Sequence, residues 1–306
     1  MKGVDNSLHL GVGHIAHNTN LGGYYQNITP AITHVLRGEF ATLDENGIPY
    51  LGSKNAKHYS PVLIIQYGLM AHDLLKENKE KELNEQRFIT CINWLEGNKH
   101  VFNDGIVWRS VSNKQYNLPD GWVSGMYQGQ AISIYLRAYQ HFQNESYLET
   151  AKLIFNSFKY DYSEGGFKRI DENGHLWFEE YPTNPPSFVL NGYIYSILGI
   201  YDFYRVTQDG KALDLWNECV TTLEKNLHKY DVWYWSVYDQ SKKQLVSYYY
   251  QKNVHVPLMQ IMYQLTEKDI FNKYAIKWEK SLNNSFHRFI TQIMYRIQPR
   301  IKKLIK

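Results

Sequence analysis

The sequence predicts a mainly α-helical fold: an α/α toroid, or partial barrel of about four antiparallel helix hairpins, with short β-hairpins at its rim. Three observations indicate it. From about residue 60 onward, apolar residues recur with the period of a helix. Turns and short polar segments divide this region into eight helical stretches, and three other stretches carry hairpin signals. In such a toroid alternate helices line an inner cavity, and the connecting loops form its mouth.

The first four helices are expected within residues 61–78, 84–95, 122–142 and 145–158. Pro61 stands in the first turn of the first helix, where its missing N–H removes no helical hydrogen bond.

The next three helices are expected within residues 188–207, 211–230 and 255–266, and the eighth from about residue 269 past Phe286. Short connections between successive helices favour antiparallel neighbours, so these eight segments pair as hairpins.

Hairpins are expected between the helices. Residues 39–51 and 165–178 each carry a central Asn-Gly, a strong hairpin signal. Residues 230–239 and 243–250 are rich in tyrosine and valine and flank a polar turn, so they predict a third hairpin. Hairpins inserted among helices indicate a decorated rim, where substrates bind.

The chain shows no linker rich in Gly, Ser or Pro, so one toroid domain is expected at 58–285. It follows an N-terminal extension, 1–57, with a short β-hairpin, and precedes a basic amphipathic tail, 286–306. The tail has an apolar stripe (Phe286, Phe289, Ile290, Ile293, Met294) and positive charges (Arg288, Arg296, Arg300, Lys302, Lys303, Lys306). Such a helix can lie on an anionic membrane, or pack on the domain with a solvated end; Pro299 is expected to interrupt it.

Bulk composition excludes several classes of protein. The 306 residues are 43% hydrophobic and 21% charged, a normal globular balance, and a net charge of +3 does not indicate a nucleic-acid-binding protein. The two cysteines, Cys91 and Cys219, are too few to form a disulfide framework, and their spacing is not that of metal ligands. We expect no metal and no cofactor. The sequence has no signal peptide and no long apolar run, so we expect a cytoplasmic protein. Peripheral contact with the inner face of the membrane, through the C-terminal tail, is an open alternative. A homodimer is also left open.

Aromatic residues are abundant, with 26 tyrosines and 8 tryptophans. Their rings suit the faces of sugars and also helix packing. The stretch 177–196, WFEEYPTNPPSFVLNGYIYS, sets Glu179, Glu180 and Tyr181 in a proline-stiffened loop directly before an apolar helix. One interpretation is a solvated surface turn. The other is a polar cluster held rigidly where a substrate binds.

This stretch resembles the signature of the D-glucuronyl C5-epimerase C-terminal domain family: Glu-Glu-Tyr-Pro-Thr, then Phe-Val-Leu-Asn-Gly. Residues 120–133, DGWVSGMYQGQAIS, are similar to the family's Gly-Trp and Gln-Gly-Gln-Ala-Ile-Ser motif, and residues 61–69 to its start. Tyr201-Asp202 also fits, and the resemblance runs from about residue 58 to 280. That family inverts C5 of glucuronate to give iduronate within heparosan-type chains. The resemblance therefore implies this activity, a helical α/α-type domain and an acidic polysaccharide partner.

The family's catalytic residues fall on four positions of this chain. Glu180 and Tyr181 match without gaps, and Tyr238 matches the tyrosine of an Ile-Tyr-Asp motif. The third tyrosine falls on Tyr250, with Tyr249 as the alternative because the spacing to the following histidine is one residue longer. Epimerisation at C5 needs a base on one ring face, an acid on the other and cations at the substrate carboxylate, and tyrosine can serve as base or acid.

The cation is harder to assign. The family has an arginine three positions after the tyrosine matched by Tyr238, and this chain has Ser241 there, followed by Lys242. The substrate-binding candidates are Arg109, Gln128, Gln130, Lys168, Arg169, Lys242 and His255. Gln128 and Gln130 have a second interpretation, in which their amides bond to loop backbone. His255 has one in which it caps a helix or orients a neighbouring side chain. Glu179 is expected to be a solvated carboxylate or one that orders the loop.

Three other functions stay open. A polysaccharide lyase shares the abstraction at C5 but then expels the C4 substituent. A glycoside hydrolase needs two carboxylates at a set separation, so one of the adjacent Glu179 and Glu180 would require a partner such as Asp239. A uronate-polymer-binding protein without activity would retain the fold, and the missing arginine favours it.

Overall fold

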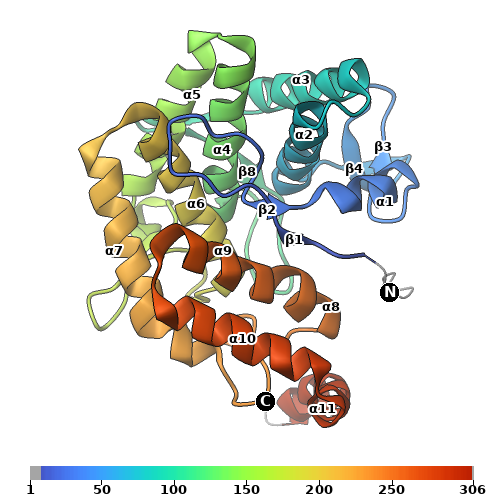
Figure 1. The fold of residues 1–306 in the computed structure, drawn as a ribbon, viewed down its shortest axis with the longest axis vertical. Helices are drawn as coiled ribbons and strands as arrows, with labels where there is room; N and C mark the ends of the chain where they lie inside the picture. The colour runs from blue at the N-terminus through green and yellow to red at the C-terminus, as the bar shows by residue number, and fades with distance from the viewer. Residues whose placement is uncertain (1–7, 305–306) are drawn as a thin grey trace.

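The computed structural model describes residues 8–304, with side chains as far as residue 297 (Figure 1). Helices dominate it, as predicted. They are α1 (Ile32–Leu36), α2 (Pro61–Lys76), α3 (Lys81–Gly97), α4 (Gly125–Phe142), α5 (Glu145–Asn156), α6 (Leu190–Thr207), α7 (Gly210–Asn226), α8 (Tyr248–Tyr250), α9 (Val256–Thr266), α10 (Asp269–Asn283) and α11 (Ser285–Leu304).

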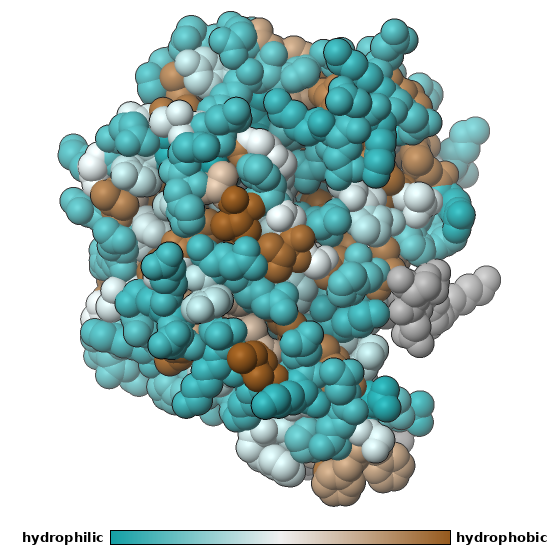
Figure 2. Space-filling model, in the orientation of Figure 1, coloured by the Kyte–Doolittle hydropathy of each residue, from teal (hydrophilic) through white to brown (hydrophobic). Residues whose placement is uncertain are grey.

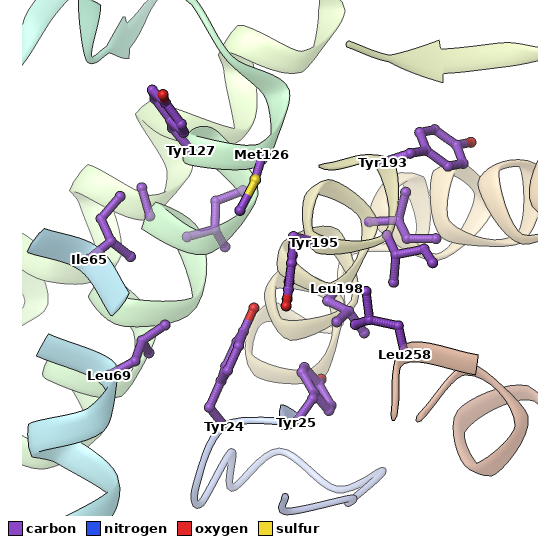
Figure 3. Close-up of a cluster of buried hydrophobic side chains, with 14 of the residues drawn as sticks. Tyr24, Tyr25, Ile65, Leu69, Met126, Tyr127, Tyr193, Tyr195, Leu198 and Leu258 are labelled. Carbon is purple, nitrogen blue, oxygen red and sulfur yellow. The ribbon is translucent and has the colours of Figure 1, made fainter. Parts of the chain in front are cut away.

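The long helices form an inner and an outer layer. Inner helix α4 is buried without a break from Gly125 to Ala138, and α6 from Leu190 to Phe203. Outer helices such as α5 and α7 bury only one face, as an amphipathic helix on the outside of a bundle does. In Figure 3, Leu69 of α2, Met126 of α4 and Tyr195 of α6 point into the space between these helices, and Leu258 of α9 lies beside it. The predicted α/α-toroid class is confirmed.

Two glycines allow the backbones of α4 and α6 to pack in direct contact. A Cβ added at Gly199 would lie 2.0 Å from the carbonyl oxygen of Gly129, and one added at Gly129 would lie 2.5 Å from the Cα of Ser196. Both distances are far inside van der Waals contact. Only glycine therefore permits this backbone approach, which positions the start of α6 beside the loop that carries Glu180.

The N-terminal segment occupies the middle of the ring. Its strands β1 (Gly11–Val12) and β2 (Gln26–Asn27) pair antiparallel, and the segment between them crosses the ring in Figure 1. In Figure 3, Tyr24 and Tyr25 rise from this segment into the cluster, where Tyr24 reaches toward Tyr195, and both are at most 1% exposed. The residues before the predicted domain start at 58 thus contribute to the same core.

The remaining strands form small antiparallel sheets at the rim. They are β3 (Thr42–Leu43), β4 (Pro49–Ser53) and β5 (Ala56–His58), then the pairs β6 (His100–Phe102) with β7 (Gly105–Val107), β8 (Arg109–Ser110) with β9 (Trp122–Val123), and β10 (Lys168–Ile170) with β11 (Leu176–Phe178). The hairpins expected in 39–51 and 165–178 are confirmed. Both turn at a glycine of positive φ, Gly47 and Gly174, which only glycine adopts without strain.

The third expected hairpin is wrong. Between residues 230–239 and 243–250 the structure has an isolated bridge from Val237 to Leu245 instead of two strands. The tyrosines 248–250 begin a helix because the Ser247 side chain accepts a hydrogen bond from the backbone N–H of Tyr250. A π-helical turn, Gln251–His255, then leads into α9.

Two helix boundaries and one predicted interruption also differ from expectation. The third helix begins at Gly125 because Trp122 and Val123 belong to β9. The eighth ends at Asn283, where the extended backbone of Asn284 breaks it, and the Asn284 side chain caps the separate helix α11. Helix α11 continues through Pro299, so the predicted interruption is wrong.

No helix of the described residues is long and apolar enough to cross a bilayer. The side chains of the tail cations Arg300, Lys302, Lys303 and Lys306 lie outside the described residues.

Candidate active site

Loops and helix ends from distant parts of the chain enclose a cavity of about 220 Å³. Tyr181 reaches it from the loop between β11 and α6, Tyr238 from the segment after α7, and Tyr250 from α8. Tyr116 and Tyr295 complete its aromatic wall, from the loop after β8 and from α11. The three tyrosines named from the sequence therefore meet at one site.

Tyr181 is held by stacking. Its ring lies parallel to that of Tyr116, with centroids 4.1 Å apart and planes inclined by 10°, and Trp122 packs on it at 5.5 Å. The Tyr116 hydroxyl donates to Asp239 Oδ2 at 2.7 Å, which fixes the supporting ring. Burial raises the pKa of Tyr181, so its phenol is protonated at neutral pH.

Glu180 is buried beside these tyrosines, with 5% of its surface exposed. Its Oε1 accepts a hydrogen bond from the Tyr238 hydroxyl at 3.1 Å, and its Oε2 accepts from Asn191 Nδ2 at 3.4 Å. Gly192 leaves room for it, because a Cβ there would lie 2.4 Å from Glu180 Oε2. Burial raises the pKa of Glu180 to about 7, against the opposing effect of hydrogen bonds from tyrosine and asparagine.

Glu179 points the other way and orders the loop. Its Oε2 accepts from the Ser187 hydroxyl at 2.6 Å and from the backbone N–H of Phe188 at 3.0 Å. Phe188 has a positive φ of 46°, so this carboxylate holds a backbone conformation that a bulky residue rarely adopts. Arg169 is its ion-pair partner at 3.6 Å.

Tyr250 is positioned by its neighbours. Its ring lies edge-on to Tyr238 at 5.6 Å and to His255 at 5.3 Å. Of the two alternatives, Tyr250 lines the cavity wall, whereas Tyr249 does not. His255 is fully buried, its Nδ1 lies 2.8 Å from the Ser236 hydroxyl, and burial lowers its pKa to about 3. Because His255 is fully buried and does not line the cavity, its imidazole packs against the ring of Tyr250 and does not form part of the cavity wall.

Lys242 and Arg109 are the basic candidates that lie near the cavity. Lys242 Nζ stands 3.7 Å from the centroid of the Tyr116 ring and donates to the carbonyl of Gln115 at 2.5 Å. Arg109 lies in an adjoining hollow, also lined by Tyr116, and donates to the carbonyl of Gly121 at 2.8 Å.

Four substrate-binding candidates are corrected. Gln128 is fully buried and donates to the Ile106 carbonyl and the Ser157 hydroxyl, so its amide belongs to the core. Gln130 is also fully buried in α4 and accepts from Gln66 at 3.4 Å. Neither side chain is accessible to a sugar.

Lys168 and Arg169 are the other two corrections. Lys168 lines a separate groove with residues of α5 and α7. Arg169 donates to the Thr183 carbonyl at 2.7 Å and covers the Tyr162 ring at 4.0 Å, besides its ion pair with Glu179. Its guanidinium therefore braces the loop that carries Tyr181 and Glu180.

Sequence reasoning missed Tyr116 and Tyr295. Each comes from a segment with no catalytic motif, and only the fold brings it to the cavity. The position of Tyr116 four residues before the motif at 120–133 is the one local signal. Asp239, the alternative partner carboxylate for a hydrolase, is 1% exposed and accepts a hydrogen bond from the Tyr116 hydroxyl. Among the described residues, no three His, Cys, Asp or Glu side chains gather as a metal site requires.

Comparison with known proteins extends these observations. The family profile described as "D-glucuronyl C5-epimerase C-terminus" matches residues 99–280. A D-glucuronyl C5-epimerase of Caenorhabditis elegans is 31% identical over 246 residues, which are 72% of this chain and 39% of that protein. An uncharacterized protein of Methanocaldococcus jannaschii is 33% identical over 179 residues, 57% of this chain and 58% of its own. The chain thus spans less than two thirds of either relative.

Solved structures support the architecture. A cellobiose 2-epimerase from Bacillus thermoamylovorans superposes with a TM-score of 0.51 at 14% identity, covering 82% of this chain and 67% of that one. An endo-β-1,4-glucanase from Acetobacter xylinum gives a TM-score of 0.51 at 13% identity, covering 78% and 74%. At this identity the likeness concerns the fold alone.

Proposed function

Because this chain belongs to the family of the D-glucuronyl C5-epimerase C-terminus, we propose that it inverts C5 of uronate residues within an acidic polysaccharide of the heparosan type. The observation that carries the proposal is the convergence of Tyr181, Tyr238 and Tyr250 on one cavity, with Glu180 bonded to the second of them.

The cavity meets the demands of the reaction. The C5–H bond next to a carboxylate is a very weak acid, so the reaction requires a base and an acid on opposite faces of the ring. Tyr181 and Tyr250 come from different segments and wall the cavity, and we assign one to each face. A buried phenol of raised pKa keeps its proton at neutral pH and is still a far stronger acid than the C5–H bond. Each phenol therefore needs help only when it must act as the base.

Glu180 supplies that help. With a pKa of about 7 it is partly ionised near neutrality, and its hydrogen bond to Tyr238 links it to the phenols. In the proposed step the phenol on one face of the ring takes the C5 proton on its oxygen and gives its own hydroxyl proton to Tyr238, which passes a proton on to the Glu180 carboxylate. The electron pair of the C5–H bond moves onto the substrate carboxylate. The phenol on the opposite face then gives its proton to C5, which completes the inversion. The proton held by Glu180 returns through Tyr238 to the phenolate left behind, which restores the site.

Lys242 is the proposed partner of the substrate carboxylate. It stands at the cavity edge where the ring of Tyr116 and the carbonyl of Gln115 orient its ammonium group. An ammonium charge there favours the build-up of negative charge on the carboxylate oxygens in the transition state.

Incubation of heparosan with the protein in deuterated water tests the proposal. We expect deuterium at C5 of uronate residues in chains of unchanged length, with iduronate appearing among them. Unsaturated chain ends would identify a lyase instead, and new reducing ends a hydrolase. Chains that bind but exchange no hydrogen would identify a binding protein.

A further inference from the structure

Helix α11 presents its polar face to the protein. Five side chains of α11, all on one face at i, i+3, i+4, i+7 and i+8, border a hollow of about 300 Å³ against the domain: Arg288, Thr291, Gln292, Tyr295 and Arg296. The domain contributes Trp235, Ser247 and Tyr248 to the same hollow. An amphipathic helix packed on a domain for stability alone would turn its apolar face inward. The inward polar face indicates a binding role.

This hollow is continuous with the active site. Ser247 and Tyr295 line both the α11 hollow and the catalytic cavity. Tyr116 lines both the catalytic cavity and the hollow that contains Arg109, and this hollow shares no lining residue with the α11 hollow. Three hollows therefore follow one another across the surface, with the catalytic tyrosines in the middle one.

The α11 hollow is positively charged and aromatic. Within the described part of the chain, the guanidinium groups of Arg288 and Arg296 form no hydrogen bond or ion pair, and no Asp or Glu lines the hollow. The two arginines are eight residues apart, about 12 Å along the helix axis. Such a spacing is comparable with the length of a disaccharide. Unpaired arginines favour carboxylates, and the faces of Tyr248 and Tyr295 suit sugar rings.

We propose that α11 forms a binding surface for the uronate and sugar residues next to the one in the catalytic cavity. The inference rests on the proposed function for the identity of the polymer. It adds that this helix, which lies beyond the matched residues 99–280, makes the protein act better on long acidic chains than on short ones. Arg288 and Arg296 bind flanking carboxylates, and neither touches the reacting atoms.

The test compares polymer with a short substrate. In the double variant Arg288→Gln/Arg296→Gln we expect KM for heparosan polymer to rise roughly fivefold to tenfold, the sum of two solvent-exposed charge contacts. The kcat at saturation should stay unchanged. KM for a heparosan tetrasaccharide, which fills little more than the catalytic cavity, should change less than twofold. Added salt should weaken polymer binding by wild type more than by the variant.

A matched control removes two exposed lysines elsewhere, Lys225→Gln/Lys273→Gln, with the same change in net charge. If the control raises KM for polymer as much as the arginine variant does, the effect is general electrostatics and the α11 surface is refuted. An arginine variant that binds and converts polymer like wild type also refutes it, and leaves the proposed function intact. Absence of C5 exchange in wild type would overturn the proposed function alone, since polymer affinity is measured separately on a heparosan column.

Discussion

Two adjacent glutamates take different roles at this site. Glu179 binds Ser187 and Phe188 and belongs to the loop, whereas Glu180 faces the tyrosines of the cavity. Both are buried, and burial raises the pKa of each to about 7. The difference between them lies in their hydrogen-bond partners. They therefore provide a matched pair for separating catalysis from loop structure.

Glu180→Gln should abolish most activity and alter the pH dependence of stability. Without the carboxylate no phenol proton can be accepted, so C5 exchange should fall by about 10²-fold or more. The raised pKa means that folded Glu180 binds more protons than unfolded Glu180 between pH 4.5 and about 7. The contribution of Glu180 to the free energy of unfolding is therefore fully present below pH 4.5, and it is lost as the pH rises through about 7. Urea denaturation at pH 5 and pH 8 should show the variant gaining relative to wild type at pH 8.

Glu179→Gln is the control. It weakens the ion pair with Arg169 and the contacts of the loop, and we expect a stability loss of about 1–3 kcal/mol. Exchange per folded molecule should fall much less than in Glu180→Gln. Equal loss of exchange in the two variants, at equal folded fraction, would contradict the separate roles of the two carboxylates.

At the scale of the elements, the crossing of α4 and α6 sets the geometry of the site. Gly199→Ala would place a methyl group 2.0 Å from the Gly129 carbonyl oxygen, so the two helices must separate. We expect the free energy of unfolding to fall by about 3 kcal/mol or more. Gly97→Ala, where nothing lies within 4 Å, should gain up to about 1 kcal/mol. Chemical denaturation measures both, and a neutral Gly199→Ala would disprove the close packing.

Helix α11 leaves its apolar side uncovered. Phe286 and Phe289 are 61% and 60% exposed, and Figure 2 shows hydrophobic side chains projecting at the end of the molecule where this helix lies. We propose that this stripe lies on the surface of an anionic membrane. Phe286→Ser/Phe289→Ser should abolish sedimentation with phosphatidylserine vesicles and leave exchange on the tetrasaccharide unchanged.

Two other exposed apolar residues, Val101 and Ile170, serve as the control for the vesicle assay. Their replacement by serine should leave vesicle binding as in wild type. If wild type fails to sediment with the vesicles and instead forms dimers that Phe286→Ser/Phe289→Ser dissolves, a second copy of the chain covers the stripe.

The sequence predicted helices and hairpins well where a single proline or glycine determines the backbone conformation. Pro61 starts α2 where expected, and Gly47 and Gly174 turn their hairpins. Prediction failed where a single side-chain bond decides between structures. Ser247 caps a helix in a stretch with strand composition, and Asn284 divides two helices whose apolar pattern runs on.

For the whole molecule, the N-terminal segment is fastened to the helical ring by buried charge. Asp202 Oδ2 lies 2.7 Å from Arg137 Nη1, and its Oδ1 accepts from the Tyr25 hydroxyl at 2.6 Å. Arg205 donates to the carbonyls of Asn18 and Asn20, at 2.9 and 2.8 Å. Only the tertiary structure brings Asp202, the two arginines and the N-terminal segment together. The sequence therefore gives no sign of these contacts, and residues 1–57 are predicted as a separate extension.

Removing the central carboxylate should therefore be costly. Asp202→Ala removes the carboxylate that lies 2.7 Å from Arg137 Nη1 and 3.4 Å from Arg205 Nη1, and we expect a stability loss of about 3–5 kcal/mol because both buried arginines lose this counter-charge. The exposed Asp214→Ala should change stability by less than about 0.5 kcal/mol. Urea midpoints would reveal the difference. Similar midpoints for the two variants would show that the buried cluster does not hold the N-terminal segment.

The site itself was predictable only in part for the same reason. Glu180 and Tyr181 stand next to each other in a recognisable motif, and Tyr238 has a short motif of its own. Tyr116 and Tyr295 lie 179 positions apart and carry none, and the burial of Gln128 and Gln130 depends on how α4 packs. Motifs in the sequence identified Glu180, Tyr181 and Tyr238, whereas the supporting wall of the cavity follows from the fold.

The most direct measurement is the rate of deuterium incorporation at C5 of heparosan by wild type, Tyr181→Phe and Tyr250→Phe, at equal folded fraction. Loss of a single hydroxyl from either ring should slow incorporation by about 10²-fold or more and leave the melting temperature within a few degrees. Wild-type rates in both variants would contradict the central claim that two phenols work from opposite faces of one sugar ring.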